Sequence, residues 1–241
     1  MSKTTVILRR EFRSYFLSPI AYVVGGLFLG IGGWLYFSRV FFDFGAGAEA
    51  RMGGFFSLLP LFFLVLVPAL SMRLWAEEKK LGTFELLLTF PVRTRDLILG
   101  KFLGGLFFVI VLLAFTLPYP ITLATYGKLD WGPVIGGYLG GILLAASYLS
   151  LGLFISSLTR DQIIALLLSV AALLVLVLLP QVGAAMSPSL AEAFKLLSPV
   201  EHFRSIARGV LDLRDLIFYI VFCGLFLYLN ALVLEFKKRN G

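Results

Sequence analysis

The stretch WAEEKKLGTFELLLTFPVRTRDLILGK, residues 75–101, is a polar interruption between two long apolar runs. Lys, Arg, Asp and Glu make up only 15% of the chain, so their concentration here marks a segment that leaves an apolar environment. We expect this stretch to face water and to meet a polar partner. Its charged residues are Glu77, Glu78, Lys79, Lys80, Glu85, Arg93, Arg95, Asp96 and Lys101.

The composition identifies a membrane protein. The chain is 59% hydrophobic and has a mean hydropathy of +0.95, whereas soluble domains are about 45–50% apolar. The net charge of +7 is explained by cationic loops that set membrane topology. No basic module with interleaved aromatic residues is present, so nucleic acid is not an expected partner.

Several kinds of chemistry lack the residues they need. With one cysteine, Cys223, and one histidine, His202, the chain can form no intrachain disulfide, and a zinc or copper site is not expected. No G-x-x-x-x-G-K-[ST] phosphate loop occurs, and the central portions of the apolar runs carry no ionisable residue. An ion-coupled carrier or a channel is therefore disfavoured. Energy for transport would have to come from another subunit.

Six apolar runs approach or exceed the ~20 residues needed to cross a bilayer. The expected fold is an all-α, polytopic membrane protein, a single transmembrane domain over residues 1–241. Pro118 and Pro120 should end or kink the third span. The predicted spans are 20–42, 55–74, 97–117, 133–158, 163–182 and 216–236.

Residues 1–18 are predicted to form a helix that lies in the membrane interface. Leu8, Phe12, Tyr15 and Phe16 follow one helical face, while Lys3, Arg9, Arg10 and Arg13 lie mostly elsewhere. The alternative is a basic flank that only orients the first span. A cleavable signal peptide is not expected, because the apolar run that follows is too long.

The distribution of lysine and arginine predicts the orientation. With the N-terminus inside, inner segments carry fourteen Lys and Arg residues and outer segments carry seven. This bias places both termini in the cytoplasm and the protein in the inner (plasma) membrane. Residues 75–96 are then cytoplasmic, and residues 183–215 face outward.

Two further segments shape the prediction. Ser187-Pro188 and Ser198-Pro199 look like helix starts, so residues 183–215 should form two short helices at or in the outer leaflet; an ordinary loop is the alternative.

Small residues spaced four apart permit close helix contacts in lipid, either within the chain or with a second copy. These are Gly136, Gly137, Gly140 and Gly141 in the fourth span, and Gly26 and Gly30 in the first.

Between Trp75 and Phe90 the sequence suits a short helix parallel to the membrane. Leu81, Phe84 and Leu88 can form an apolar strip, and Pro91 would end the helix. Such a helix can insert into a groove on a partner. The alternative is a solvated loop whose charges set the topology.

Two runs carry a family resemblance. EEKKLGTFELLLTFPVRTRDLILGKFLG, residues 77–104, resembles the signature of ABC-2-type transporter permeases, with Gly82, Thr83, Glu85, Pro91 and a final L-G-K in matching order. LSPVEHFRSIARGVLDLRDLIFY, residues 197–219, is similar to the late outer segment of the gliding-motility-type branch of that family.

The resemblance implies the membrane-spanning permease subunit of an ATP-driven ABC exporter. It implies two permease subunits, identical or related, surrounded by membrane lipid and paired with ABC ATPase subunits that bind ATP and Mg. No catalytic residue, cofactor or metal is then expected in this chain. A non-transporting membrane anchor or assembly scaffold is the alternative, and the substrate stays open.

The resemblance also assigns site residues by position. The coupling helix would contact the ATPase, the connecting helix at the N-terminus would contact it too, and the outer segment would form an external gate. The coupling set is Glu77, Glu78, Gly82, Thr83, Glu85 and Leu88; the interfacial set is Arg9, Arg10, Phe12 and Arg13; the gate set is Pro199, His202, Phe203 and Arg208.

Overall fold

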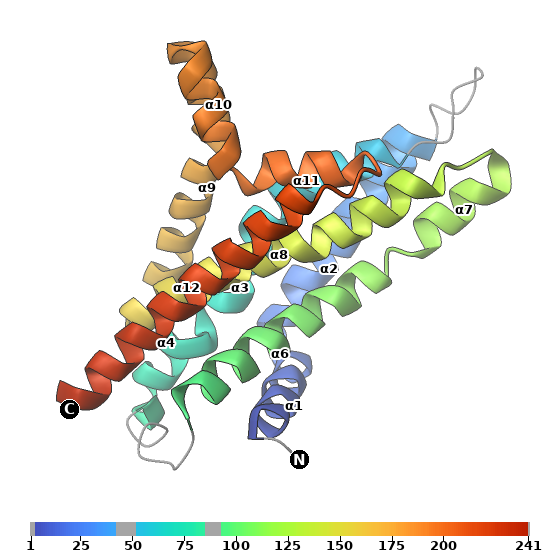
Figure 1. Ribbon diagram of the computed structural model, residues 1–241. Helices are drawn as coiled ribbons and strands as arrows, with labels where there is room; N and C mark the ends of the chain where they lie inside the picture. The colour runs from blue at the N-terminus through green and yellow to red at the C-terminus, as the bar shows by residue number, and fades with distance from the viewer. Residues whose placement is uncertain (1–2, 42–51, 85–92, 241) are drawn as a thin grey trace.

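The computed structural model describes residues 3–41, 52–84 and 93–240, and over these ranges the protein is helical without a strand (Figure 1). Six helical segments are long and apolar enough to cross a membrane, which confirms the predicted fold class. They are Pro19–Ser38, Gly53–Lys80, Thr94–Thr125, Trp131–Leu158, Gln162–Met186 and Leu213–Lys238.

The first third of the chain builds two spans and the helix that precedes them. Pro19 starts the first span because its fixed φ and missing N–H suit the first turn of a helix. This span continues into a short π-helical segment, η1, and the second span continues past Met72 into α4. The elements are α1 (Lys3–Phe16), α2 (Pro19–Leu35), η1 (Tyr36–Phe41), α3 (Gly53–Ser71) and α4 (Arg73–Lys80).

The third span is divided at its far end, as its prolines predicted. Helix α6 (Thr94–Ala114) ends, and α7 (Pro118–Tyr126) begins at Pro118 after a short turn. Together they form the third span, which therefore extends beyond the predicted limit of residue 117. The central helix α8 (Trp131–Leu158) starts at Asp130, whose side chain accepts a hydrogen bond from the Gly132 N–H at 3.0 Å.

The last third of the chain contains two long helices and two short ones. Side-chain caps fix two of the starts: Asp161 accepts from the Ile163 N–H at 2.7 Å, and Ser187 accepts from the Leu190 N–H at 3.4 Å. Two short helices occupy the segment for which they were predicted. The elements are α9 (Gln162–Met186), α10 (Pro188–Leu197), α11 (Pro199–Ala207) and α12 (Leu213–Asn240).

Helix α8 lies at the centre and packs against α3, α6, α9, α11 and α12. Its glycines make these contacts possible: a Cβ at Gly140 would lie 3.0 Å from Phe203 Cδ2, and one at Gly137 would clash with the Phe56 ring. The α8 glycines therefore serve packing within the chain. By contrast, a Cβ at Gly26 or Gly30 of α2 would meet no described atom within 4 Å.

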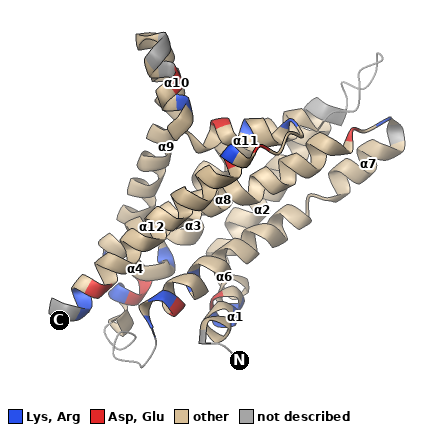
Figure 2. Ribbon diagram, viewed as in Figure 1, with Lys and Arg blue, Asp and Glu red and all other residues tan. Residues whose placement is uncertain are grey.

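Both termini lie at one end of the bundle, called here the proximal end, and the α7–α8 turn and α11 lie toward the opposite, distal end (Figure 1). Charged residues gather at these ends and leave the middle of the bundle apolar (Figure 2). The membrane-spanning windows of α2, α9 and α12 are only 28%, 22% and 11% buried, so these helices carry most of the outward apolar surface.

Candidate functional site

Helix α4 extends the second span and ends at Lys80, where Gly82 takes a φ of +70°. A left-handed residue just past a helix end is most often glycine, because a side chain adds strain there. The Leu81 N–H closes the last turn on the Glu77 carbonyl at 2.9 Å. The helix predicted between Trp75 and Phe90 is therefore not continuous, because α4 ends at Lys80 and Gly82 interrupts it; residues 85–90 of that range lie outside the described residues.

A buried ionic cluster joins three elements next to this helix end. The Lys101 ammonium of α6 lies 3.0 Å from Glu11 Oε1 of α1 and 2.8 Å from Glu78 Oε1 of α4. Lys101 is 2% exposed and lies 4.9 Å above the ring centroid of the fully buried Trp75. A buried charge needs such pairing to offset its lost hydration. We call Glu11, Glu78 and Lys101 the Lys101 cluster.

Glycines on α6 bring Glu11 to Lys101. A Cβ at Gly104 would lie 2.8 Å from Glu11 Cβ, and one at Gly100 would lie 2.5 Å from Ile7 Cγ2. Helix α1 thus rests directly on the backbone of α6, close to the lysine. Thr4 adds a polar contact by donating to Asp96 Oδ1 at 2.8 Å, in the first turn of α6.

The joint between α3 and α4 is held by α8. Ser156 Oγ accepts from the N–H groups of Trp75 and Ala76, each at 3.2 Å, and donates to the Met72 carbonyl at 2.9 Å. Lys79 then reaches the end of α8, where its ammonium donates to the carbonyls of Ser156, Ser157 and Thr159. A cation at a helix C-terminus satisfies free carbonyls and complements the helix dipole.

Helix α12 joins the same end of α8. The Lys237 ammonium donates to the Ser157 carbonyl at 3.0 Å. Lys79 and Lys237 also lie 5.4 and 5.8 Å from the ring centroid of Phe84, just beyond Gly82. The residues around α4 are thus tied to α1, α6, α8 and α12 at once.

The predicted coupling residues separate into two kinds. Gly82 and Thr83 are exposed and Glu77 is half-buried, so they reach the proximal surface. Glu78 points inward to Lys101, so it can affect a partner only through the cluster. Glu85 and Leu88 lie outside the described residues.

A polar hollow of about 500 Å³ opens between α1 and α4 at the proximal surface. It combines both signs of charge, and members of the Lys101 cluster line its inner wall. A hollow of this size and polarity provides a recess for a polar protrusion. Its charged lining residues are Arg10, Glu11, Arg73, Glu77, Glu78 and Lys101.

The predicted interfacial residues lie on α1 as the amphipathic pattern requires. Arg9, Arg10 and Arg13 are exposed, while Phe12 is half-buried with its ring centroid 5.0 Å from that of Phe16. On the opposite face, Tyr15 is fully buried and donates to the Leu70 carbonyl at 3.2 Å. Burial raises the pKa of Tyr15, so its hydroxyl keeps the proton that this bond uses.

At the distal end, three of the four predicted gate residues pack together. His202 Nδ1 lies 2.6 Å from Asp215 Oδ1, and its Nε2 lies 3.1 Å from the Leu196 carbonyl. Phe203 packs on Gly140, and the Pro199 carbonyl accepts from the Tyr219 hydroxyl at 2.7 Å. Arg208 remains exposed at the end of α11.

Sequence reasoning missed the inward role of Glu11 and Lys101. A signal was present: Glu11 is the only acidic residue among residues 1–18, and Lys101 lies beside Gly100 in the third span, with Gly104 one turn later. A lone acid on a basic helix and a lysine next to small residues make these two side chains candidates for a closer look, but neither pattern says that the two pair.

The geometry defines a polytopic helical membrane protein with a polar proximal end linked to its spans. The chain belongs to the family described as ABC-2 family transporter protein, whose profile matches residues 12–237. Among curated proteins none matches this chain. The family comprises membrane-spanning permease subunits that are not themselves catalytic.

Proposed function

We propose that this chain forms the translocation pathway of an ATP-driven exporter and couples it to a separate ABC ATPase subunit. The proximal end is the cytoplasmic end, so both termini and the Gly82 region face the ATPase. A second permease subunit, identical or related, completes the pathway. The ATPase binds ATP and Mg. We also propose that the chain belongs near the gliding-motility-type branch, which residues 197–219 resemble.

The Lys101 cluster is the observation that carries this proposal. It joins the last turn of α4, which leads into the surface turn at Gly82, to α1 and to α6, which begins the third span. Displacement of this turn by a partner therefore acts on α3 through the α3–α4 joint and on α6 through the buried ion pair. Packed contacts of this kind between a docking surface and the spans can carry such coupling.

The orientation rests on two supports. The proximal segments hold most of the lysine and arginine residues, as the cytoplasmic side of a membrane protein does. The charged proximal surface and the hollow between α1 and α4 also offer a recess of mixed charge for a protein partner.

A co-purification experiment tests the docking site. The full chain is isolated from its native membranes with Glu77→Arg and Thr83→Arg, beside a matched control with Glu192→Arg on exposed α10. We expect an ATPase that contains a G-x-x-x-x-G-K-[ST] loop to accompany the wild type and the control, and to be lost from the proximal variant. Equal recovery in all three preparations would refute docking at this surface.

The alternative is a non-transporting anchor for the same ATPase. It predicts binding without movement of the spans. Single cysteines on α3 and α6, probed for reactivity with and without ATP and vanadate in the reconstituted complex, separate the two functions. An exporter should show ATP-dependent changes in reactivity, whereas an anchor should show none.

A further inference from the structure

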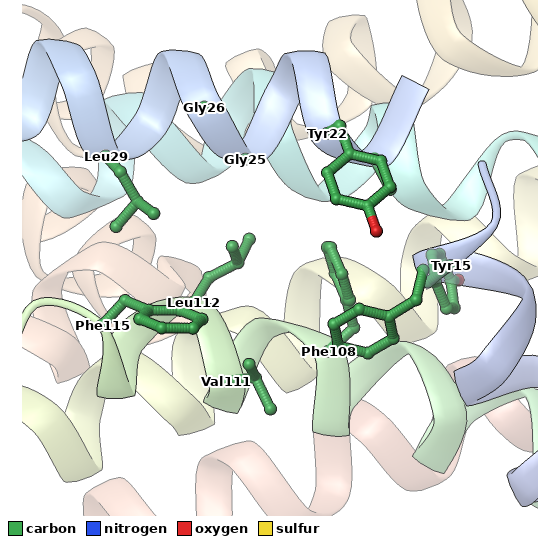
Figure 3. A pocket seen from close by; sticks show the side chains of 11 residues that line it. Tyr15, Tyr22, Gly25, Gly26, Leu29, Phe108, Val111, Leu112 and Phe115 are labelled. Carbon is green, nitrogen blue, oxygen red and sulfur yellow. The ribbon is translucent and has the colours of Figure 1, made fainter. Parts of the chain in front are cut away.

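An apolar groove runs between α2 and α6, beside the elbow where α1 meets α2 (Figure 3). Its volume is about 220 Å³, which is less than the ~300–1,000 Å³ of sites for drug-sized molecules. It therefore suits a narrow apolar chain better than a bulky ligand. Leu29 and Leu112 point into it from its two sides (Figure 3), Val111 and Phe115 also line it, and Phe108 lies toward the elbow.

Glycine keeps the α2 side of the groove open. Gly25 and Gly26 both line it, and a Cβ at Gly26 would meet no described atom within 4 Å. The groove opens sideways between two membrane-spanning helices whose nearby side chains Tyr22 and Phe115 are 63% and 62% exposed. In a bilayer the molecules that surround such a surface are lipids, so an acyl chain is the occupant that fits.

Arginines lie where the groove reaches the proximal interface. Phe16 lines the groove and follows Arg13 by three residues and Arg9 by seven, so the three share one face of α1. Arg9 and Arg13 are exposed and also line a shallow hollow on the outer face of α1. Among the described residues, neither arginine forms a hydrogen bond or ion pair, whereas Arg73 donates to Ser14 Oγ at 2.8 Å.

We infer that this elbow binds one anionic phospholipid, with its phosphate at Arg9 and Arg13 and one acyl chain in the α2–α6 groove. The charge of the two arginines complements a phosphate, and the apolar groove begins one helical turn away. An interfacial helix with a basic face is the usual element for this contact. Arg10 lines both the shallow hollow at Arg9 and Arg13 and the α1–α4 hollow, so the proposed lipid site and the proposed protein site adjoin along α1.

Lipid binding can be measured on the purified full chain by native mass spectrometry, with phosphatidylglycerol and phosphatidylcholine of identical acyl chains added in turn. We expect preferential retention of phosphatidylglycerol. Arg9→Gln with Arg13→Gln should lower its affinity about fivefold per arginine and lower that of phosphatidylcholine less, because the choline cation offsets the phosphate charge. The matched control, Arg208→Gln with Arg214→Gln, removes the same charge from exposed distal positions and should change neither lipid.

The groove is tested separately by filling it. Gly26→Leu places a side chain in open space, so the fold should tolerate it while the retention of both lipids falls. Gly30→Leu is the matched control: it lies one turn further along α2, also in open space, and it does not line the groove. It should retain lipid as the wild type does.

Three results would overturn the inference. Equal retention of the two lipids by the wild type would remove the role of the arginines. Equal losses in the test variants and their controls would show that no defined site exists. A change in oligomeric state on Gly26→Leu with lipid retention unchanged would assign the groove to a second copy of this chain. Loss of the proposed ATPase partner would leave all these measurements intact, so the two proposals fail independently.

Discussion

The two ends of the protein each hold a buried polar contact, but the contacts differ in what they join. At the proximal end, Lys101 connects Glu11 and Glu78, which are 90 and 23 residues away along the chain. At the distal end, His202 and Asp215 are 13 residues apart and belong to one connected segment, α11 and the start of α12.

The two contacts also differ in where their carboxylates lie relative to the helix dipoles. Glu78 lies in the last turn of α4, where the helix dipole disfavours a carboxylate, so it depends on Lys101. Asp215 lies in the first turn of α12, where the dipole favours a carboxylate even without a partner. We conclude that the proximal contact connects elements that are far apart in the sequence, whereas the distal contact is local and connects α11 to the start of α12.

The largest expected effect is that of Lys101→Met. It leaves two buried carboxylates without their cation, and breaking such a pair costs about 3–5 kcal/mol. The free energy of unfolding in a denaturant titration should fall by that amount, and amide exchange should rise in α1 and α4 but not in α11. Lys80→Met, at an exposed position of α4, is the control.

Replacement of the whole cluster sharpens this test. Glu11→Leu and Glu78→Leu added to Lys101→Met remove the stranded carboxylates, and apolar replacements of complete buried ion pairs are often neutral in stability. The triple variant should therefore recover most of the lost stability. A triple variant that is no more stable than the single one would show that packing, not charge, dominates the joint.

Gly104→Val tests the packing of α1 on α6 while it leaves the three charged residues of the Lys101 cluster in the sequence. Its side chain would push against Glu11 Cβ and the backbone of α1, and overpacking of this kind costs about 1–3 kcal/mol. Amide exchange of α1 should rise with the cluster residues unchanged. The same substitution at Gly26 meets open space, so it should leave the free energy of unfolding close to that of the wild type.

His202→Phe is the distal counterpart of Lys101→Met. It keeps a ring against Phe218 but removes the partner of the buried Asp215, at a cost of about 1–3 kcal/mol. Exchange should rise only in α11 and in the first turns of α12. A rise that extends to α1 would contradict the local character assigned to the distal contact.

The smallest expected effect is at the surface turn. Gly82→Ala forces a side chain into a left-handed conformation at a cost of about 1–2 kcal/mol, without touching the cluster, because a Cβ there meets no described atom within 4 Å. In the proposed complex the variant should lower the stimulation of the partner's ATPase activity, whereas the free energy of unfolding should fall only by that small cost. Stimulation equal to the wild type would place docking elsewhere.

Local patterns account for what sequence reasoning predicted correctly. Each apolar run is long enough to be recognised as a span, and Pro118, Ser187 and Ser198 mark where helices start. The prediction failed at Gly82, where a helical pattern on both sides concealed one left-handed residue. The sequence also did not decide whether the spaced glycines of α2 and α8 contact helices within the chain or a second copy.

The sequence alone determined the all-α class, the six spans and the amphipathic first helix, because hydropathy and periodicity are properties of single segments. Only the tertiary structure decided which charges are buried and which glycines face a neighbour. Glu11, Glu78 and Lys101 lie in three separate segments, each of which has several charged residues that look equally exposed in sequence. Their pairing depends on how α1 rests on α6, which no local pattern specifies.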